Sequence, residues 1–381
     1  MEQQEIRSKF PVFSQNKRLV YLDNAATSQK PEGVIDRVRQ FYLSENSNIH
    51  RGNYPLSSRA SERYDHSKQT VCHWIDARTP EEIVYTKSST EAINLVAAGM
   101  DGLTGSENNI VTTELEHSSN YFPWKELCRR TGVQFRVAEA EEDGSLKTEK
   151  LLKLIDCHTK LVAVTGMSNA GGFCPDLKKI ISEAHNKGAL VLVDATQLIA
   201  HRRIFVQELD CDFLSFSSHK IYGPMGLGVL YGKQSCLELI PPLLYGGDMV
   251  LRGDGGQIIY KSNTEKFEGG TQNIGGALGL ETAIKFLQEN EFEVLLEHEK
   301  ALAAYTRQRL EKIKGLNILN SGPDSPIILF EMDGIGAYDV GVLLGLKDIA
   351  VRCGSHCAYP LMKRLERQSL CRVSLAVYNT K

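Results

Sequence analysis

The middle of the chain alternates short apolar runs with amphipathic segments, and this alternation limits the fold more than any other feature. The apolar runs predict strands at residues 83–85, 110–113, 133–137, 160–165, 190–193, 212–216 and 228–231. Helices are predicted between several of these strands, at 92–98, 119–130 and 177–186. Strands that are apolar throughout, with helices between them, indicate a largely parallel sheet covered on both faces. We therefore expect an α/β fold.

The pattern changes after about residue 265, where longer helices outnumber the strands. Helices are predicted at 276–289, 292–313 and 338–344, and strands at 326–330 and 349–352. A chain of 381 residues is long for a single core. We predict a large domain over 16–265 with a mostly parallel seven-stranded sheet. A smaller α+β domain is predicted from 1–15 together with 266–381.

Composition and charge exclude several classes of protein. The chain is 42% hydrophobic and 24% charged with a net charge of −3, and it has no basic block that would favour nucleic acid or a membrane surface. No apolar run approaches the ~18 residues of a membrane helix. The first residues are too polar for a secretory signal. Nine irregularly spaced cysteines, without a zinc-type pattern, favour reduced thiols in the cytoplasm and no bound metal.

Polar side chains follow several of the predicted strands, where open α/β sheets bind their ligands. Asp194 ends one strand, and Lys220 follows another shortly after its end. This layout suits pyridoxal 5′-phosphate (PLP), because a lysine forms a Schiff base with its aldehyde and an aspartate keeps its pyridine nitrogen protonated. Ser89 and Thr90 open a helix, and a helix N-terminus is a natural phosphate site. Each signal alone is weak, since a lysine after a strand usually lies on the surface. Their combination is much more specific.

Other polar residues near these strand ends extend the predicted site. Ser217 and His219 flank the lysine as further phosphate donors, and Gln197 is expected to reach the ring hydroxyl. His117 follows another strand and is expected to stack on the ring.

The chain resembles the cysteine desulfurases of the class V aminotransferase family, and among them the SufS-like (group II) branch. The resemblance covers almost the whole chain. It is carried by YLDNAAT (21–27), HRG (50–52), TEAINLV (90–96), EH with Asn120 (116–117), SN (168–169), Asp194 with Gln197, HKIYGP (219–224), FEGGT (267–271), VRCGSHCA (351–358) and CRVS (371–374). The resemblance implies a PLP-dependent transferase of fold type I.

The resemblance also implies roles for individual residues. Lys220 would be the Schiff-base lysine and later a proton shuttle, with His117 assisting proton transfer. The remaining cofactor contacts would come from Ser89, Thr90, Asn169, Asp194, Gln197, Ser217, His219 and, from the other subunit of a homodimer, Thr271.

Substrate binding and sulfur transfer are assigned by the same resemblance. Arg372 would clamp the carboxylate of L-cysteine, aided by Asn169, with Arg352 and His50 as further contributors. Cys357 would accept the sulfur as a persulfide and pass it to a SufE- or SufU-like acceptor protein, as in iron–sulfur cluster assembly.

Cys357 competes with eight other cysteines for this role, and most cysteines are inert packing. Its polar neighbours in a loop after a strand favour exposure. A thiol needs a nearby base or cation to be a thiolate at neutral pH, and His356, Arg352 and His117 are all candidates. Cys353 is expected to pack, the alternative being a disulfide that traps the persulfide, and Cys371 is expected to be structural.

Two alternatives to a desulfurase stay open at this level. The first is another PLP enzyme of the same family, such as a selenocysteine lyase, another C–S lyase or an aminotransferase. The second is a degenerate relative that acts as a scaffold. Several positions depart from the family's pattern without removing a core role. These departures are Lys87, Ser88, Ser118, residues 170–174, Gln272 and Ser355.

Overall fold

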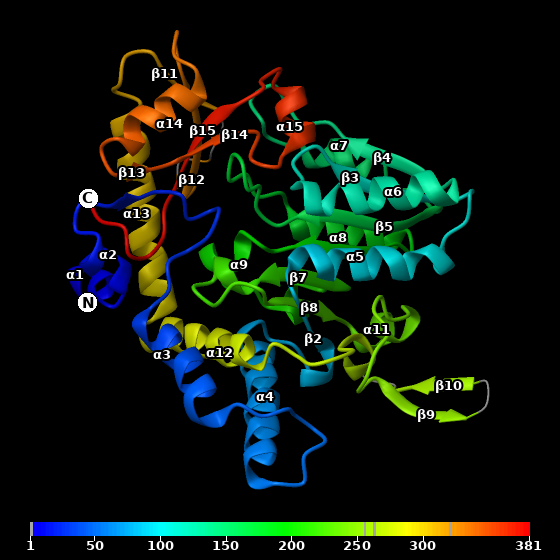
Figure 1. Cartoon of the computed structure of the whole chain (residues 1–381). Helices are drawn as coiled ribbons and strands as arrows, with labels where there is room; N and C mark the ends of the chain where they lie inside the picture. Colours follow the sequence, from blue (N-terminus) through cyan, green and yellow to red (C-terminus); the bar gives the residue numbers. More distant parts are fainter. Residues whose placement is uncertain (1–2, 255–256, 262–263, 320–321, 323) are drawn as a thin grey trace.

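A computed structural model describes residues 3–254, 257–261, 264–319, 322 and 324–381 (Figure 1). Its centre is a seven-stranded sheet. In spatial order its strands are β2 (Ile83–Thr86), β8 (Gly228–Gly232), β7 (Phe213–Ser217), β6 (Leu190–Asp194), β5 (Thr159–Thr165), β3 (Asn109–Thr113) and β4 (Gln134–Ala138). Only β8 runs against its neighbours, β2 and β7; the other adjacent pairs are parallel. The predicted α/β fold with a mostly parallel seven-stranded sheet is confirmed.

Helices cover both faces of this sheet because successive strand residues face opposite ways. In β5, Leu161 and Ala163 join one core cluster, whereas Val162 and Val164 join the other. Helices α5 (Ser89–Met100) and α6 (Phe122–Thr131) contribute to the first cluster. The second cluster includes residues of α4 (Pro55–Trp74), α8 (Leu177–Asn186) and α12 (Ile274–Glu289). Burial on both faces explains why the strands are apolar throughout.

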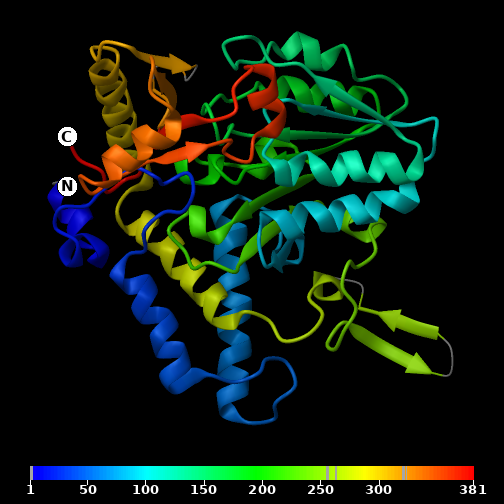
Figure 2. The same ribbon diagram turned by 45° about the horizontal axis from the view of Figure 1, so that its top comes forward.

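A second, four-stranded sheet lies beside the first (Figures 1 and 2). It is antiparallel, and its strands in spatial order are β11 (Leu316–Leu319), β12 (Ile327–Met332), β15 (Leu370–Ser374) and β14 (Arg352–Gly354). Helices α13 (Phe292–Leu310) and α14 (Ala337–Gly345) pack with it around a separate apolar cluster. The division into a large domain and a small domain stays a prediction.

The strand predicted at 349–352 is two strands in the structure. Its first part is β13 (Ile349–Ala350), which pairs in parallel with β1 (Val20–Tyr21). The second part is β14, which pairs with β15. The two parts have different partners, so the apolar run changes sheets within a few residues.

Several elements escaped the sequence analysis because they are short or polar. The shorter helices are α1 (Gln3–Ser8), α2 (Pro11–Gln15), α7 (Thr148–Leu152), α9 (Leu198–His201), α10 (Val206–Leu209), α11 (Gln234–Leu239) and α15 (Tyr359–Arg364). Helix α3 (Glu32–Gln40) overlaps residues 35–44, whose amphipathic pattern already indicates a helix. A hairpin of β9 (Val250–Asp254) and β10 (Gln257–Tyr260) projects from the body (Figures 1 and 2). Within the described residues, no helix combines the length and apolar character that a membrane span requires.

Candidate active site

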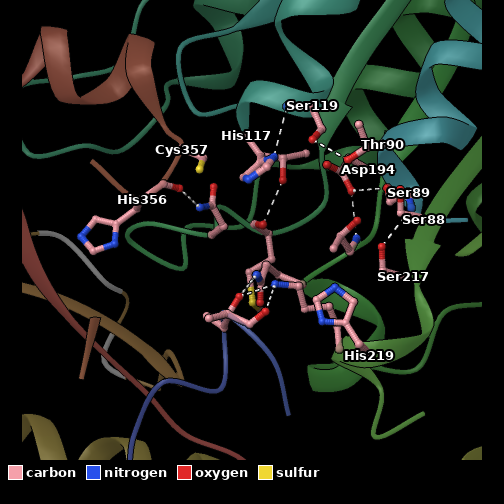
Figure 3. A pocket seen from close by; sticks show the side chains of 18 of the residues that line it. Ser88, Ser89, Thr90, His117, Ser119, Asp194, Ser217, His219, His356 and Cys357 are labelled. Carbon is pink, nitrogen blue, oxygen red and sulfur yellow. Dashed lines mark hydrogen bonds between the residues drawn. The ribbon is translucent and has the colours of Figure 1, made fainter. Parts of the chain in front are cut away.

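A cavity of about 290 Å³ lies where the strand ends of the large sheet meet β14 and β15 (Figure 3). All the predicted site residues line it except Thr271 and His50. Those that line it are Ser89, Thr90, His117, Asn169, Asp194, Gln197, Ser217, His219, Lys220, Arg352, Cys357 and Arg372. Residues far apart in the sequence therefore meet in one pocket.

Lys220 lies just beyond the end of β7, in a short 3₁₀ turn. Its Nζ donates to the carbonyl oxygens of Ala25 and Ala26, the second at 2.8 Å. Burial, with the nearby charge of Arg372, lowers the pKa of Lys220 to about 7. A substantial part of the amine is therefore neutral at neutral pH, as a nucleophile or proton acceptor requires.

Asp194 ends β6 and is buried beside Lys220. Its Oδ1 accepts from the Thr196 backbone N–H at 3.0 Å and from the Ser89 hydroxyl at 3.5 Å. No lysine or arginine forms an ion pair with it among the described residues. A buried carboxylate without a cation is costly, and a protonated ring nitrogen would supply the missing charge.

The N-terminus of α5 gathers hydroxyl groups around the same end of the pocket. The Ser88 hydroxyl caps the helix by accepting from the Glu91 N–H at 3.3 Å. The backbone N–H of Ser89 donates to the Ser217 hydroxyl at 2.9 Å, and the Thr90 hydroxyl lies 2.8 Å from that of Ser119. Hydroxyl groups and the positive end of the helix dipole at a helix N-terminus favour an anion.

Two histidines of the pocket are held in the neutral form. Burial lowers the pKa of His117, and its Nδ1 accepts the Ser119 N–H at 3.1 Å, so the proton resides on Nε2. Burial and the adjacent Lys220 lower the pKa of His219 to about 4. Its Nδ1 lies 3.1 Å from the Thr27 hydroxyl. Both rings therefore act near neutral pH as uncharged hydrogen-bonding groups.

Two arginines face the opposite side of the pocket and share one carboxylate. Arg372 on β15 is almost fully buried, and it donates to the Asn169 carbonyl at 2.8 Å and to Asp23 at 3.2 Å. Arg352 on β14 donates to the same Asp23 at 3.2 Å, with its side chain about half exposed. The Nε of Arg372 finds no partner within the described part of the chain. A buried, unpaired N–H in a pocket wall is suited to a carboxylate ligand.

Cys357 is exposed in the loop after β14, and both it and His356 have left-handed backbone angles, with φ of 52° and 55°. The loop is fastened to the large sheet at two carbonyls. The His356 carbonyl accepts from Asn169 at 2.6 Å, and the Cys357 carbonyl accepts from the backbone and hydroxyl of Ser118, both at 2.7 Å. These contacts hold the Cys357 sulfur at the pocket rim (Figure 3).

The structure narrows the three candidates for activating Cys357. The His356 ring is buried, and its Nε2 donates to the Leu370 carbonyl at 3.0 Å. Burial lowers the pKa of His356 to about 3, so this ring stays neutral. The pKa of Arg352 is raised chiefly by Asp23, with a further contribution from Cys357. Arg352 and Arg372 are therefore both close enough to Cys357 to interact with its charge.

The donor set of the pocket fits PLP. Asp194 matches the pyridine nitrogen, the hydroxyl cluster of α5 matches the phosphate, and Lys220 matches the aldehyde. Two further buried oxygens, Asn169 Oδ1 and Thr196 Oγ1, have no hydrogen-bond partner among the described residues. Unsatisfied buried polar atoms in a pocket indicate a polar ligand.

His50 and Thr271 lie apart from this pocket but close to each other. His50 lines a separate small hollow with Asp248, Gly270 and Gln272, and Thr271 is exposed between the last two. The His50 Nε2 lies 3.3 Å from Asp65, whose hydrogen bond raises the pKa of His50. Within one chain, neither side chain lines the large cavity.

Sequence reasoning missed several residues that shape the pocket. Asp23 and Ser118 make the contacts described above, and Ser88, Ser119 and Thr196 line the cavity. Ser88 had a visible signal, because it precedes Glu91 by three residues, as in a helix-capping box. For Asp23, the only signal in the sequence was its membership of the 21–27 motif.

Comparisons with known proteins agree with this geometry. Residues 20–381 match the family described as aminotransferase class-V. The chain is 40% identical over its full length to a probable cysteine desulfurase of Halalkalibacterium halodurans, covering 95% of that protein. It is 40% identical to a cysteine desulfurase of Enterobacter sp., over 99% of this chain and 94% of the relative.

A solved structure is also similar along the whole chain. The crystal structure of the cysteine desulfurase CsdA of Escherichia coli, in an S-sulfonic acid form, matches with a TM-score of 0.93 and 34% identity. The match covers 100% of this chain and 95% of that chain.

Proposed function

This chain belongs to the class-V aminotransferase family, and from that premise we propose that it is a PLP-dependent cysteine desulfurase. The reaction converts L-cysteine to L-alanine and leaves the sulfur on the enzyme. The observation that carries the proposal is the convergence of Lys220, Asp194, Arg372 and Cys357 on one cavity. Selenocysteine lyase and other C–S lyase activities are not favoured, because the full-length relatives are desulfurases.

PLP is the cofactor, and when bound it supplies an electron sink that stabilises negative charge on the substrate carbon. We propose that Asp194 holds the ring nitrogen and that Gln197 contacts the ring hydroxyl. His117 is proposed to stack on the ring with Asn169 nearby. The phosphate site is proposed from Ser89, Thr90, Ser217 and His219.

The remaining steps depend on side chains of this protein. Arg372, aided by Asn169, binds the substrate carboxylate through its unpaired Nε, and Arg352 adds a second positive charge. Lys220 removes the substrate α-proton at Nζ as a neutral amine and later returns a proton to carbon. His117 donates or accepts a proton through Nε2 beside it.

Cys357 takes the sulfur in the proposed mechanism. Its thiolate forms a bond with the substrate sulfur while the carbon–sulfur bond of the substrate breaks, which leaves a persulfide on the enzyme. The released carbon is protonated and leaves as L-alanine. The guanidinium groups of Arg352 and Arg372 place positive charge near the sulfur.

The exposed position of Cys357 suits transfer of the persulfide to a second protein. We propose a SufE- or SufU-like acceptor and a place in iron–sulfur cluster assembly, as in the group II branch. A cytoplasmic location is proposed with it, since all nine cysteines are free thiols, which suits a reducing compartment.

We also propose a homodimer in which His50 and Thr271 complete the pocket of the partner subunit. Two residues assigned to the site by resemblance lie together on a surface outside their own cavity, which supports this arrangement. Thr271→Ala should weaken PLP binding although Thr271 lies outside the pocket of its own chain. Sedimentation should give a dimer, and a monomer that binds PLP tightly would contradict the proposal.

The function is tested by replacing the two exposed cysteines separately. Cys357→Ala should lower sulfide release from L-cysteine, in the presence of a reductant, by ~10³-fold or more, because the nucleophile is removed. The variant should still bind PLP and absorb visible light. Cys157→Ala is the matched control, since Cys157 is also exposed but lies outside the pocket, and it should keep full activity. Full activity of Cys357→Ala would reject the proposed nucleophile.

A further inference from the structure

Cys353 and Cys371 face each other directly across two antiparallel strands. The register of β14 and β15 pairs Arg352 with Arg372, Cys353 with Cys371 and Gly354 with Leu370. The two sulfur atoms lie 3.5 Å apart. Opposed residues of an antiparallel pair are about 4.5–5.5 Å apart at Cβ, which is close to the separation that a disulfide needs. Formation of an S–S bond of about 2.05 Å requires only a small movement of each sulfur.

The pair points away from the active-site cavity, toward α14. Side chains alternate along a strand, so Arg352 faces Asp23 while Cys353 faces the opposite way. A Cβ at Gly341 of α14 would come within 2.7 Å of the Cys353 sulfur, and Cys371 donates to the Ala337 carbonyl at 3.4 Å. The predicted packing role of Cys353 is therefore observed, and its partner is Cys371 rather than Cys357.

The two thiols differ in access and acidity. Cys371 is fully buried, whereas Cys353 is partly exposed. The contact between the two sulfur atoms lowers the pKa of Cys353, and the same contact, together with burial, raises the pKa of Cys371. Cys353 is therefore the thiol that reacts first with a dissolved oxidant, and Cys371 is the thiol that resolves the product.

We propose that Cys353 and Cys371 form a reversible disulfide when the protein meets a hydroperoxide, and that this bond fastens the Cys357 loop. The Cys353 thiolate attacks the peroxide, the O–O bond breaks, and a sulfenic acid and water result. The Cys371 sulfur then displaces the hydroxyl of the sulfenic acid as a second water. Two thiols and one hydrogen peroxide give one disulfide and two waters, so atoms and electrons balance.

The bond would close a loop with a sequence separation of 18 residues that contains Cys357 and α15. Arg352 directly precedes one end of the cross-link and Arg372 directly follows the other. Cross-linking restricts the mobility of the enclosed segment, which contains the exposed thiol of Cys357. Formation of the disulfide is independent of the proposed activity. Its effect on sulfur transfer, through the restricted Cys357 loop, rests on the role proposed for Cys357.

The test uses the holoenzyme, first treated with a phosphine reductant that is then removed. After brief exposure to hydrogen peroxide and blocking of free thiols, mass spectrometry should find a peptide linking Cys353 to Cys371. The count of free thiols should fall by two, and phosphine should restore it. Amide hydrogen exchange across 354–369 should slow on oxidation and recover on reduction.

Variants make the result decisive without an activity assay. Cys371→Ser should leave Cys353 as a sulfenic or sulfonic acid and abolish the linked peptide, and Cys353→Ala repeats the test if the first variant fails to fold. Cys157→Ser is the matched control and should still form the Cys353–Cys371 disulfide. Cys357→Ala should form it too, and this variant separates the disulfide proposal from the proposed function. A peptide linking Cys353 to Cys357, oxidation of Cys353 without any link, or unchanged hydrogen exchange in the cross-linked protein would overturn the proposal.

Discussion

The two sheets hold their halves of the pocket by different means. On the seven-stranded sheet, Asp194 and Lys220 follow parallel strands whose residues are buried on both faces, and backbone groups fix their side chains. On the four-stranded sheet, Arg352 and Arg372 are held mainly by one carboxylate, that of Asp23. The proposed cofactor contacts thus depend on strand packing, whereas the proposed substrate contacts depend on a network of charges.

This difference also separates the two ends of the reaction. The cofactor end has little freedom, because its groups sit in the turns that directly follow core strands. The sulfur end is an exposed loop held through the carbonyls of His356 and Cys357. A group that must deliver sulfur to another protein needs such exposure, and a group that must stay aligned with a ring does not.

The largest expected effect is on the side of the seven-stranded sheet. Lys220→Ala should lower desulfurase turnover by ~10⁴-fold or more, because it removes both the attachment point and the proton-transfer group. The visible absorption of the bound cofactor should shift. Lys30→Ala is the control, since burial also lowers the pKa of Lys30, to about 8, but Lys30 does not line the cavity. An unchanged spectrum in Lys220→Ala would remove the lysine assignment.

The two arginines should differ strongly although they share Asp23. Arg372→Lys loses the planar fork at a buried site, and the KM for L-cysteine should rise ~10- to 10²-fold, the value of a hydrogen bond to a charged group. Arg352→Lys changes a half-exposed pair and should alter KM by no more than about threefold. Steady-state kinetics on both variants measure the difference. Equal effects would show that burial does not separate their roles.

Asp23→Asn tests the charge network itself. The buried guanidinium of Arg372 loses its carboxylate partner, so kcat/KM should fall about tenfold and the melting temperature should decrease. The spectrum of bound PLP should stay close to that of the wild type, because the Asp23 side chain bonds to the two arginines and acts on Lys220 only through a charge interaction weaker than the effect of burial. Asp23→Glu should recover part of the loss, and a variant with wild-type KM would disprove a positioning role.

An effect no larger than that of Asp23→Asn is a pH dependence at the cofactor end. The pKa of Lys220 is about 7 in the ligand-free protein, and only the neutral amine is a nucleophile. The rate of PLP attachment to the apoprotein should rise about tenfold between pH 6 and pH 8 and then level off. Stopped-flow absorbance measures this rate. A rate that keeps rising above pH 9 would mean that burial does not lower the pKa.

Much of the large sheet was predictable because its strands are apolar on both faces. The run at 190–193 and the helix at 177–186 are found in the structure as β6 and α8. The small sheet was harder to predict. Strand β15 contains the buried Arg372, and β14 follows β13 within the same run, so neither shows a simple hydrophobic period.

The sequence by itself indicated the groups that we propose to react, because Lys220, Asp194 and the hydroxyls of Ser89 and Thr90 each stand shortly after a predicted core strand. Only the tertiary structure decided which distant groups hold them. Asp23 meets Arg372, Ser118 meets the Cys357 carbonyl, and Cys353 meets Cys371. These pairings depend on strand register and on loops packed from opposite ends of the chain, and no local pattern of residues encodes such long-range geometry.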